Sequence, residues 1–149
     1  MKNMMKTLAV VAVMLLAGLT AQAQNRADDI LGTWWNAEKT SKIEVYKNGN
    51  KYFGKIIHLE TPNDDQGKPR VDKDNPDAKL RNRPLMGLVI LKGLEYDEDG
   101  EFEDGEIYDP KSGKTYSANA KLVGKDKLDL RGYVGISLIG RTSTWTRAK

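Results

Sequence analysis

The stretch KIEVYKNGNKYFGKIIHL, residues 42–59, decides how this chain begins to fold. Across residues 43–47, apolar and polar side chains alternate with a period of two, which is typical of a half-buried β-strand. Asn48-Gly49-Asn50 then provides a strong tight-turn signal. Residues 52–59 return as a second run suited to a strand. The stretch therefore predicts an antiparallel hairpin.

The rest of the chain repeats this hairpin pattern. A first strand is expected at residues 33–38, and further strands separated by turn residues are expected at 85–94, 102–108, 114–123, 127–133 and 139–147. About eight strands at hairpin spacing predict an all-β fold, a single antiparallel up-and-down β-barrel. A barrel of this size is either filled by side chains or holds one small ligand.

One polar segment interrupts the pattern. Residues 60–83 are rich in Pro, Asp, Asn and Lys and contain few apolar residues. The segment is too long for an ordinary hairpin loop, so we expect a functional loop or a folded cap. Residues 77–83 could form a helical turn before Pro84 stops it.

The N-terminus has the pattern of an export signal. Lys2 and Lys6 precede an apolar run at residues 8–19, and Ala21-Gln22-Ala23 is a small-x-small cleavage site. We therefore expect a signal peptide at residues 1–23 and a single domain at residues 24–149. The periplasm is the expected location, with full secretion as the alternative. The apolar run is too short for a comfortable membrane span. No later segment comes near the roughly 20 apolar residues that a span needs, so no transmembrane segment is expected in the mature chain.

The composition of the mature chain excludes several classes of site and function. It has no cysteine, which excludes disulfides, thiolate catalysis and a lipidated N-terminal Cys. The whole chain carries 24 Lys and Arg against 21 Asp and Glu, and the signal contains two of the lysines. The mature domain is therefore close to neutral, and no basic stripe with interleaved aromatic residues predicts nucleic-acid binding.

Three punctuated segments carry a resemblance to a known family. They are the run LRNRPLMGL at residues 80–88, the run IYDP through GKTY at residues 107–116, and the segment from Arg131-Gly132-Tyr133 to Trp145-Thr146-Arg147. Together they resemble the small secreted bacterial family called domain of unknown function 2147. The resemblance covers nearly all of the mature chain. It supports the barrel but implies no established activity.

The two ends of the domain also resemble the lipocalins and their calycin relatives. In those barrels a Gly-x-Trp motif near the start packs under a basic side chain from the last strand. Gly32-Thr33-Trp34 opens the first expected strand, and Arg147 ends the last. The resemblance implies that Trp34 and Arg147 close the barrel, with Arg141 as the alternative arginine. A guanidinium stacked on an indole is a favourable cation–π contact.

Four side chains are candidates for ligand binding. Arg81 and Arg83 flank the start of an apolar strand and could hold a carboxylate or phosphate. The alternative is that they tie the long loop to Asp72 or its acidic neighbours. Tyr108 and Tyr116 lie on either side of a hairpin turn that could form a ligand-contacting rim, or could be turn chemistry alone.

Other groups of residues match known metal or phosphate sites only in part. Asp72, Asp74 and Asp77 offer alternating carboxylates that could bind calcium, but the glycine and distal glutamate of an EF-hand loop are missing. His58 is the single histidine of the chain, without a second His or any Cys to complete a zinc site. Gly113-Lys114-Thr115 lacks the upstream glycine of a phosphate-binding loop. No catalytic residue, resident metal or cofactor is therefore predicted.

These observations predict an exported, lipocalin-like binding protein. Its ligand would be small and apolar or amphipathic and would enter the barrel mouth beside residues 60–83. The alternative is an envelope module or inhibitor whose solid barrel contacts another protein through its loops. The presence of an interior cavity discriminates between the two.

Overall fold

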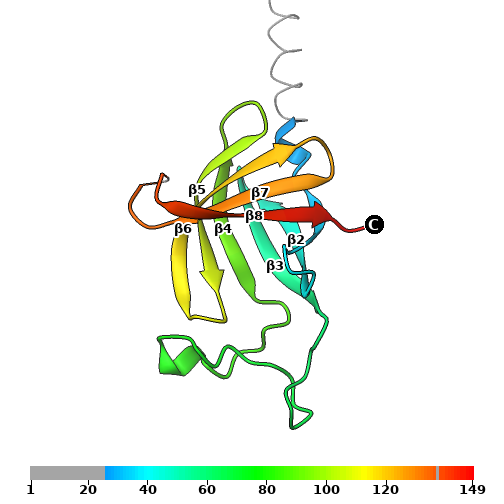
Figure 1. The fold of residues 1–149 in the computed structure, drawn as a ribbon, viewed down its shortest axis with the longest axis vertical. Coiled ribbons are helices and arrows are strands. Elements are labelled where there is room, and N and C mark those ends of the chain that lie inside the picture. Colours follow the sequence, from blue (N-terminus) through cyan, green and yellow to red (C-terminus); the bar gives the residue numbers. More distant parts are fainter. Residues whose placement is uncertain (1–25, 137) are drawn as a thin grey trace, which may run out of the picture.

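The computed structural model describes residues 26–136 and 138–149, so the expected signal peptide at residues 1–23 lies outside the described part. The described chain is a closed antiparallel barrel, drawn in Figure 1. Its strands are β1 (Gly32–Trp35), β2 (Ser41–Asn48), β3 (Lys51–Leu59), β4 (Val89–Tyr96), β5 (Glu101–Asp109), β6 (Lys114–Val123), β7 (Lys127–Tyr133) and β8 (Gly140–Arg147). The predicted all-β, up-and-down architecture is thus confirmed.

Each strand pairs with its neighbour in sequence, and the last strand returns to the first. β8 pairs with β1 through Trp34 opposite Arg147 and Trp35 opposite Thr146. This pairing removes both sheet edges, which would otherwise present unpaired backbone groups to other chains. Among the described residues, no helix has the length and apolar character needed to cross a membrane.

The two ends of the barrel differ in their connections. The turns β2–β3, β4–β5 and β6–β7 are short and lie at one end, together with a helical turn at residues 26–28. The opposite end carries the β1–β2, β5–β6 and β7–β8 connections and the long loop between β3 and β4. Figure 1 shows this loop extending beyond the strands at the end opposite the β4–β5 turn.

The core fills the half of the barrel nearest the short turns. Its largest fully buried apolar side chains are Trp34, Tyr52, Phe102, Ile30, Ile43, Leu91, Leu94 and Leu128. The surroundings of two glycines show how tightly this half is packed. A Cβ on Gly54 would lie 2.9 Å from Ile43, and a Cβ on Gly105 would lie 2.6 Å from Leu94. Both distances are shorter than a packed interior allows, so these positions have no room for a side chain.

The largest departures of the strand bounds from the expectation are at the end of β1 and the start of β4. β1 ends at Trp35 rather than residue 38, because the Asn36 side chain accepts hydrogen bonds from the Thr40 and Ser41 amides and turns the chain. β4 begins at Val89 rather than residue 85. The preceding residues turn at Gly87, which has a φ of 84° and donates its amide to the Ile56 carbonyl.

The long loop contains a short helical element. The 3₁₀ turn η1 spans Ala78–Leu80, and the Asp77 carboxylate accepts a hydrogen bond from the Lys79 amide. The sequence predicts a helical turn within residues 77–83, and the structure has a shorter one there. The buried residues Ala27 and Ile30 of the N-terminal turn cover the packed end of the barrel. The sequence pattern does not predict this cover.

Candidate functional site

A cavity occupies the half of the barrel that the core leaves open. Its volume is about 1340 Å³. The apolar wall comes from inward-facing positions of the strands, including Ile43, Ile56, Ile90, Ile107, Leu130 and Trp145. Gly132 leaves space on this wall, because the nearest atoms to a Cβ placed there, on Ile107 and Tyr116, are 3.6 Å away. That ordinary spacing contrasts with the tight contacts around Gly54 and Gly105.

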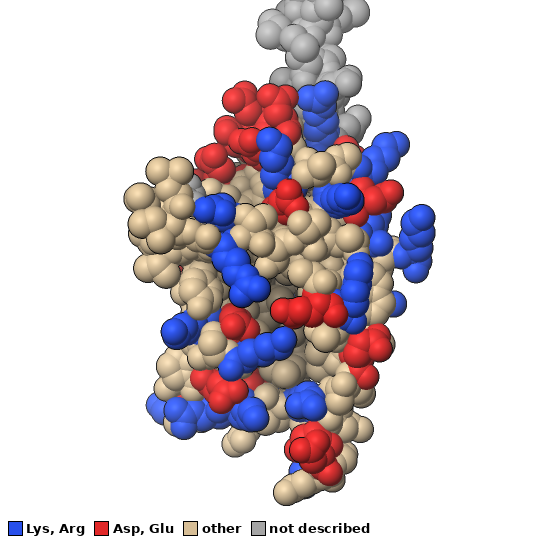
Figure 2. All heavy atoms as spheres, viewed as in Figure 1, with Lys and Arg blue, Asp and Glu red and all other residues tan. Residues whose placement is uncertain are grey.

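The rim of the cavity is polar and built from the connections at the open end. Charged rim side chains of both signs include Glu38, Asp64, Arg70, Lys73, Asp74, Asp109, Lys111 and Arg141. Several are held by protein partners. Lys111 lies 3.3 Å from Glu38, and Arg70 donates through Nε to the Thr61 carbonyl. Figure 2 likewise shows charges of both signs interspersed over one face of the molecule.

A buried carboxylate anchors the long loop beside this rim. Asp72 is fully buried and accepts hydrogen bonds from Tyr108 Oη at 2.6 Å, Asn75 Nδ2 at 2.8 Å and Arg83 Nε at 2.9 Å. Burial acts to raise the pKa of Asp72, but the three hydrogen bonds and the Arg83 charge outweigh burial and hold it below its usual 3.8. The same burial and the Asp72 charge raise the pKa of Tyr108. The network fixes residues 72–83 against β5.

The predicted ligand-binding arginines lie outside the cavity lining. Arg83 is held by Asp72, and Arg81 donates through Nε to the Asn75 carbonyl. The contact with Asp72 is the one that the structural alternative predicts. Tyr108 and Tyr116 do line the cavity, although the Tyr108 hydroxyl is used by Asp72. The two tyrosines therefore line the cavity and the two arginines do not, although the Arg83 guanidinium lies 5.7 Å from the centroid of the Tyr108 ring. The binding role of the arginines stays a prediction.

The opposite end of the barrel carries the contact expected for closure. The Arg147 guanidinium lies 4.2 Å from the centroid of the Trp34 ring and donates to the carbonyls of Leu31 and Asp29. Trp34 is buried and donates through Nε1 to the Ile30 carbonyl. A Cβ on Gly32 would lie 2.9 Å from Arg147 Nη1, so the glycine lets the guanidinium reach the indole. Arg141, the alternative, is at the other end of β8.

The chain is similar to known proteins in both sequence and fold. Residues 32–147 match the family model described as an uncharacterized protein conserved in bacteria, DUF2147.

The chain belongs to the DUF2147 family.

A solved structure is also similar to this DUF2147 chain, that of protein HP1028 from the human pathogen Helicobacter pylori. It is 27% identical, with a TM-score of 0.69, over 80% of this chain and 83% of that one. HP1028 belongs to the lipocalin family. The lipocalin-like, calycin-type barrel predicted from the sequence is confirmed. No curated protein matched the chain.

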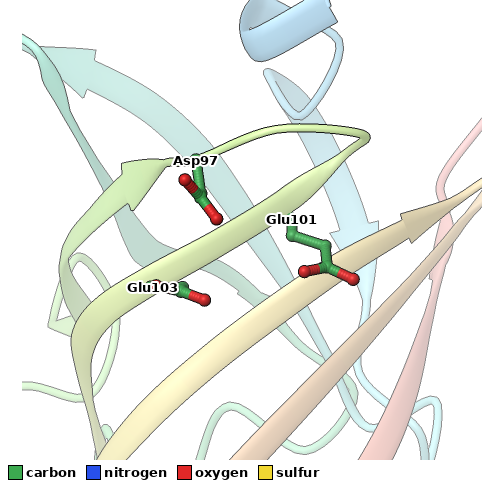
Figure 3. A group of neighbouring side chains, drawn as sticks. All are labelled: Asp97, Glu101 and Glu103. Atoms are coloured by element: carbon green, nitrogen blue, oxygen red, sulfur yellow. The ribbon is translucent and has the colours of Figure 1, made fainter.

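Two sets of acidic residues in the DUF2147 chain are candidates for metal sites. In the first, Asp97, Glu101 and Glu103 place carboxylate oxygens within 4.8 Å of one another. Figure 3 shows the three side chains on the β4–β5 hairpin. They lie at the packed end, and Glu101 is paired with Lys121 at 3.1 Å. Exposed acidic clusters of this kind are common, and we assign no ion to it.

The calcium candidates of the long loop are largely occupied by the protein itself. Asp72 accepts three side-chain hydrogen bonds, and Asp77 caps η1. His58 is also engaged, since its Nε2 lies 3.0 Å from Glu60 Oε1 and its ring packs edge-on against Trp35. These residues act in local structure at the base of the loop.

Two features at the mouth of the cavity were not predicted from the sequence. Arg141 lines the cavity at its rim, and the alternation of Arg141, Ser143 and Trp145 along the last strand was the signal that could have placed it on the inner face. The second missed feature is the surface of the β7–β8 loop. In the structure this loop exposes apolar side chains, with Val134 72% and Leu138 86% exposed. In Figure 2 it forms the uncharged lobe at the left.

Proposed function

We propose that this DUF2147 protein binds a small apolar or amphipathic molecule inside its barrel. The observation that carries the proposal is the cavity of about 1340 Å³, which extends from the open half of the barrel to the loops at its mouth and has an apolar wall and a polar rim. Small-molecule sites are typically concave and mostly apolar, with a few polar groups that orient the ligand. Eight-stranded barrels of lipocalin type are wide enough for one such ligand.

The distribution of packing supports binding over a purely structural barrel. The half next to Trp34 is packed so closely that Gly54 and Gly105 cannot carry a side chain. The other half is lined by Ile107, Leu130 and similar residues without being filled by them. The alternative function, a solid module that contacts a protein partner, assumes a filled interior. The cavity therefore favours the carrier.

The proposed setting is the bacterial envelope. The N-terminal pattern of Lys2, Lys6, an apolar run and Ala21-Gln22-Ala23 supports export followed by cleavage. A carrier in the periplasm would shield an apolar molecule from water on its way between membranes or enzymes. Full secretion would place the same chemistry outside the cell.

Native mass spectrometry of the protein purified from its own envelope tests the proposal. The expected result is a bound species of discrete mass that is released on activation. A cavity-filling variant, Gly132→Val, should lose this species, because the new side chain projects into the cavity without a backbone clash. Asn119→Val, on the outer face of β6, is the matched control and should retain it. A wild-type protein that carries no small molecule and binds no added amphiphile would overturn the proposal.

A further inference from the structure

Arg141 stands on the inner face of the last strand at the mouth of the cavity. Residues two apart in a strand point to the same face, so Arg141, Ser143 and Trp145 share one side of β8. All three line the cavity. Trp145 is buried, whereas Arg141 is exposed at the rim. The strand thus runs from a charged mouth to an apolar interior.

Arg141 differs from the other described arginines in having no protein partner. Within residues 26–136 and 138–149, its side chain makes no hydrogen bond or ion pair. The remaining described arginines each contact a carboxylate, hydroxyl or carbonyl: Arg26, Arg70, Arg81, Arg83, Arg131 and Arg147. A guanidinium is permanently charged and presents five N–H donors, so these donors are available to a ligand.

The space opposite Arg141 is kept open. The residue paired with Arg141 on the neighbouring strand β7 is Gly132, which has no side chain. The nearest side-chain atoms around Gly132 belong to Ile107 and Tyr116. Tyr116 and Ser143, which both carry hydroxyl groups, line the same cavity as Arg141. A guanidinium with neighbouring hydroxyl groups suits an anionic, oxygen-rich group.

Among the described residues, no acidic residue of the rim forms an ion pair with Arg141. Glu38 is paired with Lys111. Asp64 accepts hydrogen bonds from the Gln66 and Lys68 amides of its own loop. Asp109 accepts hydrogen bonds from the Lys111 amide and the Ser112 hydroxyl. Among the rim acids, that leaves Asp74, which is adjacent to Lys73 in sequence.

We propose that Arg141 binds the head group of a single-chain anionic amphiphile, a carboxylate or a phosphate monoester. The chain of that molecule lies along the apolar wall formed by Ile43, Ile90 and Leu130. The inference rests on the proposed ligand-binding function and specifies its substrate class and orientation. Charge-assisted hydrogen bonds in a partly desolvated mouth favour the anion over a neutral head group by about tenfold or more.

Calorimetric titration with matched amphiphiles tests the inference. Dodecanoate, dodecyl phosphate, dodecanol and dodecyltrimethylammonium share one chain length and differ in the head group. Wild-type protein should bind one or both anions about tenfold or more tightly than dodecanol, and the stronger of the two identifies the head group. Arg141→Gln should remove this preference and leave the affinity for dodecanol unchanged. Arg141→Glu should reverse the preference toward the ammonium compound.

The control variant is Arg131→Gln. Arg131 is on the neighbouring strand at the same end, but it lies outside the cavity lining and bonds to Thr142. It should keep the preference for the anion. Equal binding of dodecanoate, dodecyl phosphate and dodecanol, unchanged in Arg141→Gln, would overturn the role of Arg141 while leaving the cavity as a binding site. Absence of binding by all four compounds would overturn the ligand-binding function and this inference together.

Discussion

The carboxylate of Asp72 is buried beneath the long loop, where it accepts hydrogen bonds from Tyr108, Asn75 and Arg83. A buried charge without partners would be costly, and three donors offset that cost here. The arrangement explains why a segment with few apolar residues keeps one position over β5. It also makes the loop sensitive to the protonation of a single residue.

We expect the anchoring by Asp72 to weaken in acid. The pKa of Asp72 is lower in the folded than in the unfolded protein, so its stabilisation is complete above the ordinary value of 3.8 and is lost as the pH falls through the folded pKa. At pH 7, Asp72→Asn should lower the free energy of unfolding by about 1–3 kcal/mol. Urea unfolding between pH 7 and pH 2 should show this difference shrinking below about pH 4. Asp65→Asn, exposed in the same loop, is the control, and a difference independent of pH would contradict the assignment.

Trp34 and Arg147 should act as one stabilising unit. Trp34→Ala removes a buried indole and should cost about 3–5 kcal/mol of unfolding free energy. Arg147→Ala should cost less, since it loses a cation–π contact worth about 0.5–2 kcal/mol and hydrogen bonds to the Leu31 and Asp29 carbonyls. Urea unfolding of both single variants and the double variant measures their coupling. Strict additivity would show that the two side chains stabilise the fold independently.

At the scale of elements, the loop between β3 and β4 is tied down by side chains more than by apolar packing. Arg83 holds Asp72 from the far end of the loop, and Arg81 holds the Asn75 carbonyl between them. Backbone pairing of Asn63 with Pro69 and of Val71 with Pro84 adds two isolated bridges. Loss of the side-chain contacts should therefore loosen a loop that lines part of the rim.

Arg81→Ala combined with Arg83→Ala separates a binding role from a structural one. From the observed contacts we expect a lower melting temperature and little change in the affinity for dodecanol, because neither arginine lines the main cavity. Thermal unfolding and calorimetry of the same samples provide both readouts. A large loss of affinity for anionic amphiphiles with an unchanged melting temperature would instead support the ligand-binding role predicted from the sequence.

The acidic β4–β5 hairpin should be dispensable. Asp97, Glu101 and Glu103 bring three carboxylates together at the packed end, away from the cavity. The triple change to Asn, Gln and Gln removes like-charge repulsion and one exposed pair with Lys121, effects that are each small at a surface. Stability should stay within about 0.5 kcal/mol, and amphiphile binding should be unchanged. A calcium-dependent rise in the melting temperature of the wild type, absent from the variant, would contradict this expectation.

At the scale of the whole molecule, the barrel divides into a packed half and an open half. Turns of a few residues and the cover from Ala27 and Ile30 close the first. Connections that include the long loop between β3 and β4 surround the second and leave the cavity accessible. A single up-and-down sheet thus combines a packed, stable half with a cavity that has space for a ligand.

The exported protein should begin at Gln24. Ala21-Gln22-Ala23 follows the apolar run at the spacing that signal peptidases use. Intact-mass measurement and N-terminal sequencing of protein recovered from the envelope check the expectation. Substitution of Ala23 by a bulky residue should block processing and serves as the control. Recovery of envelope protein that retains Met1 would contradict it.

Local sequence determined the order of the strands and the closure of the barrel. Alternating side chains and turn residues such as Asn48-Gly49-Asn50 act over a few positions, so hairpins can be predicted without knowing what they pack against. The resemblance to the lipocalins implied the pairing of Trp34 with Arg147, and the closed sheet places the two residues opposite one another.

Tertiary structure alone decided what the barrel contains and where its charges lie. Whether Gly132 leaves a space or Gly105 fills a crowded core depends on neighbours from other strands, since both glycines look alike in sequence. The partner of Arg83 is 11 residues away, and Tyr108 reaches Asp72 across 36. Glu38, a rim acid, is paired with Lys111 and not with Arg141, a choice that only the folded chain shows. Contacts of this kind depend on distances in space, which residue spacing along the chain does not specify.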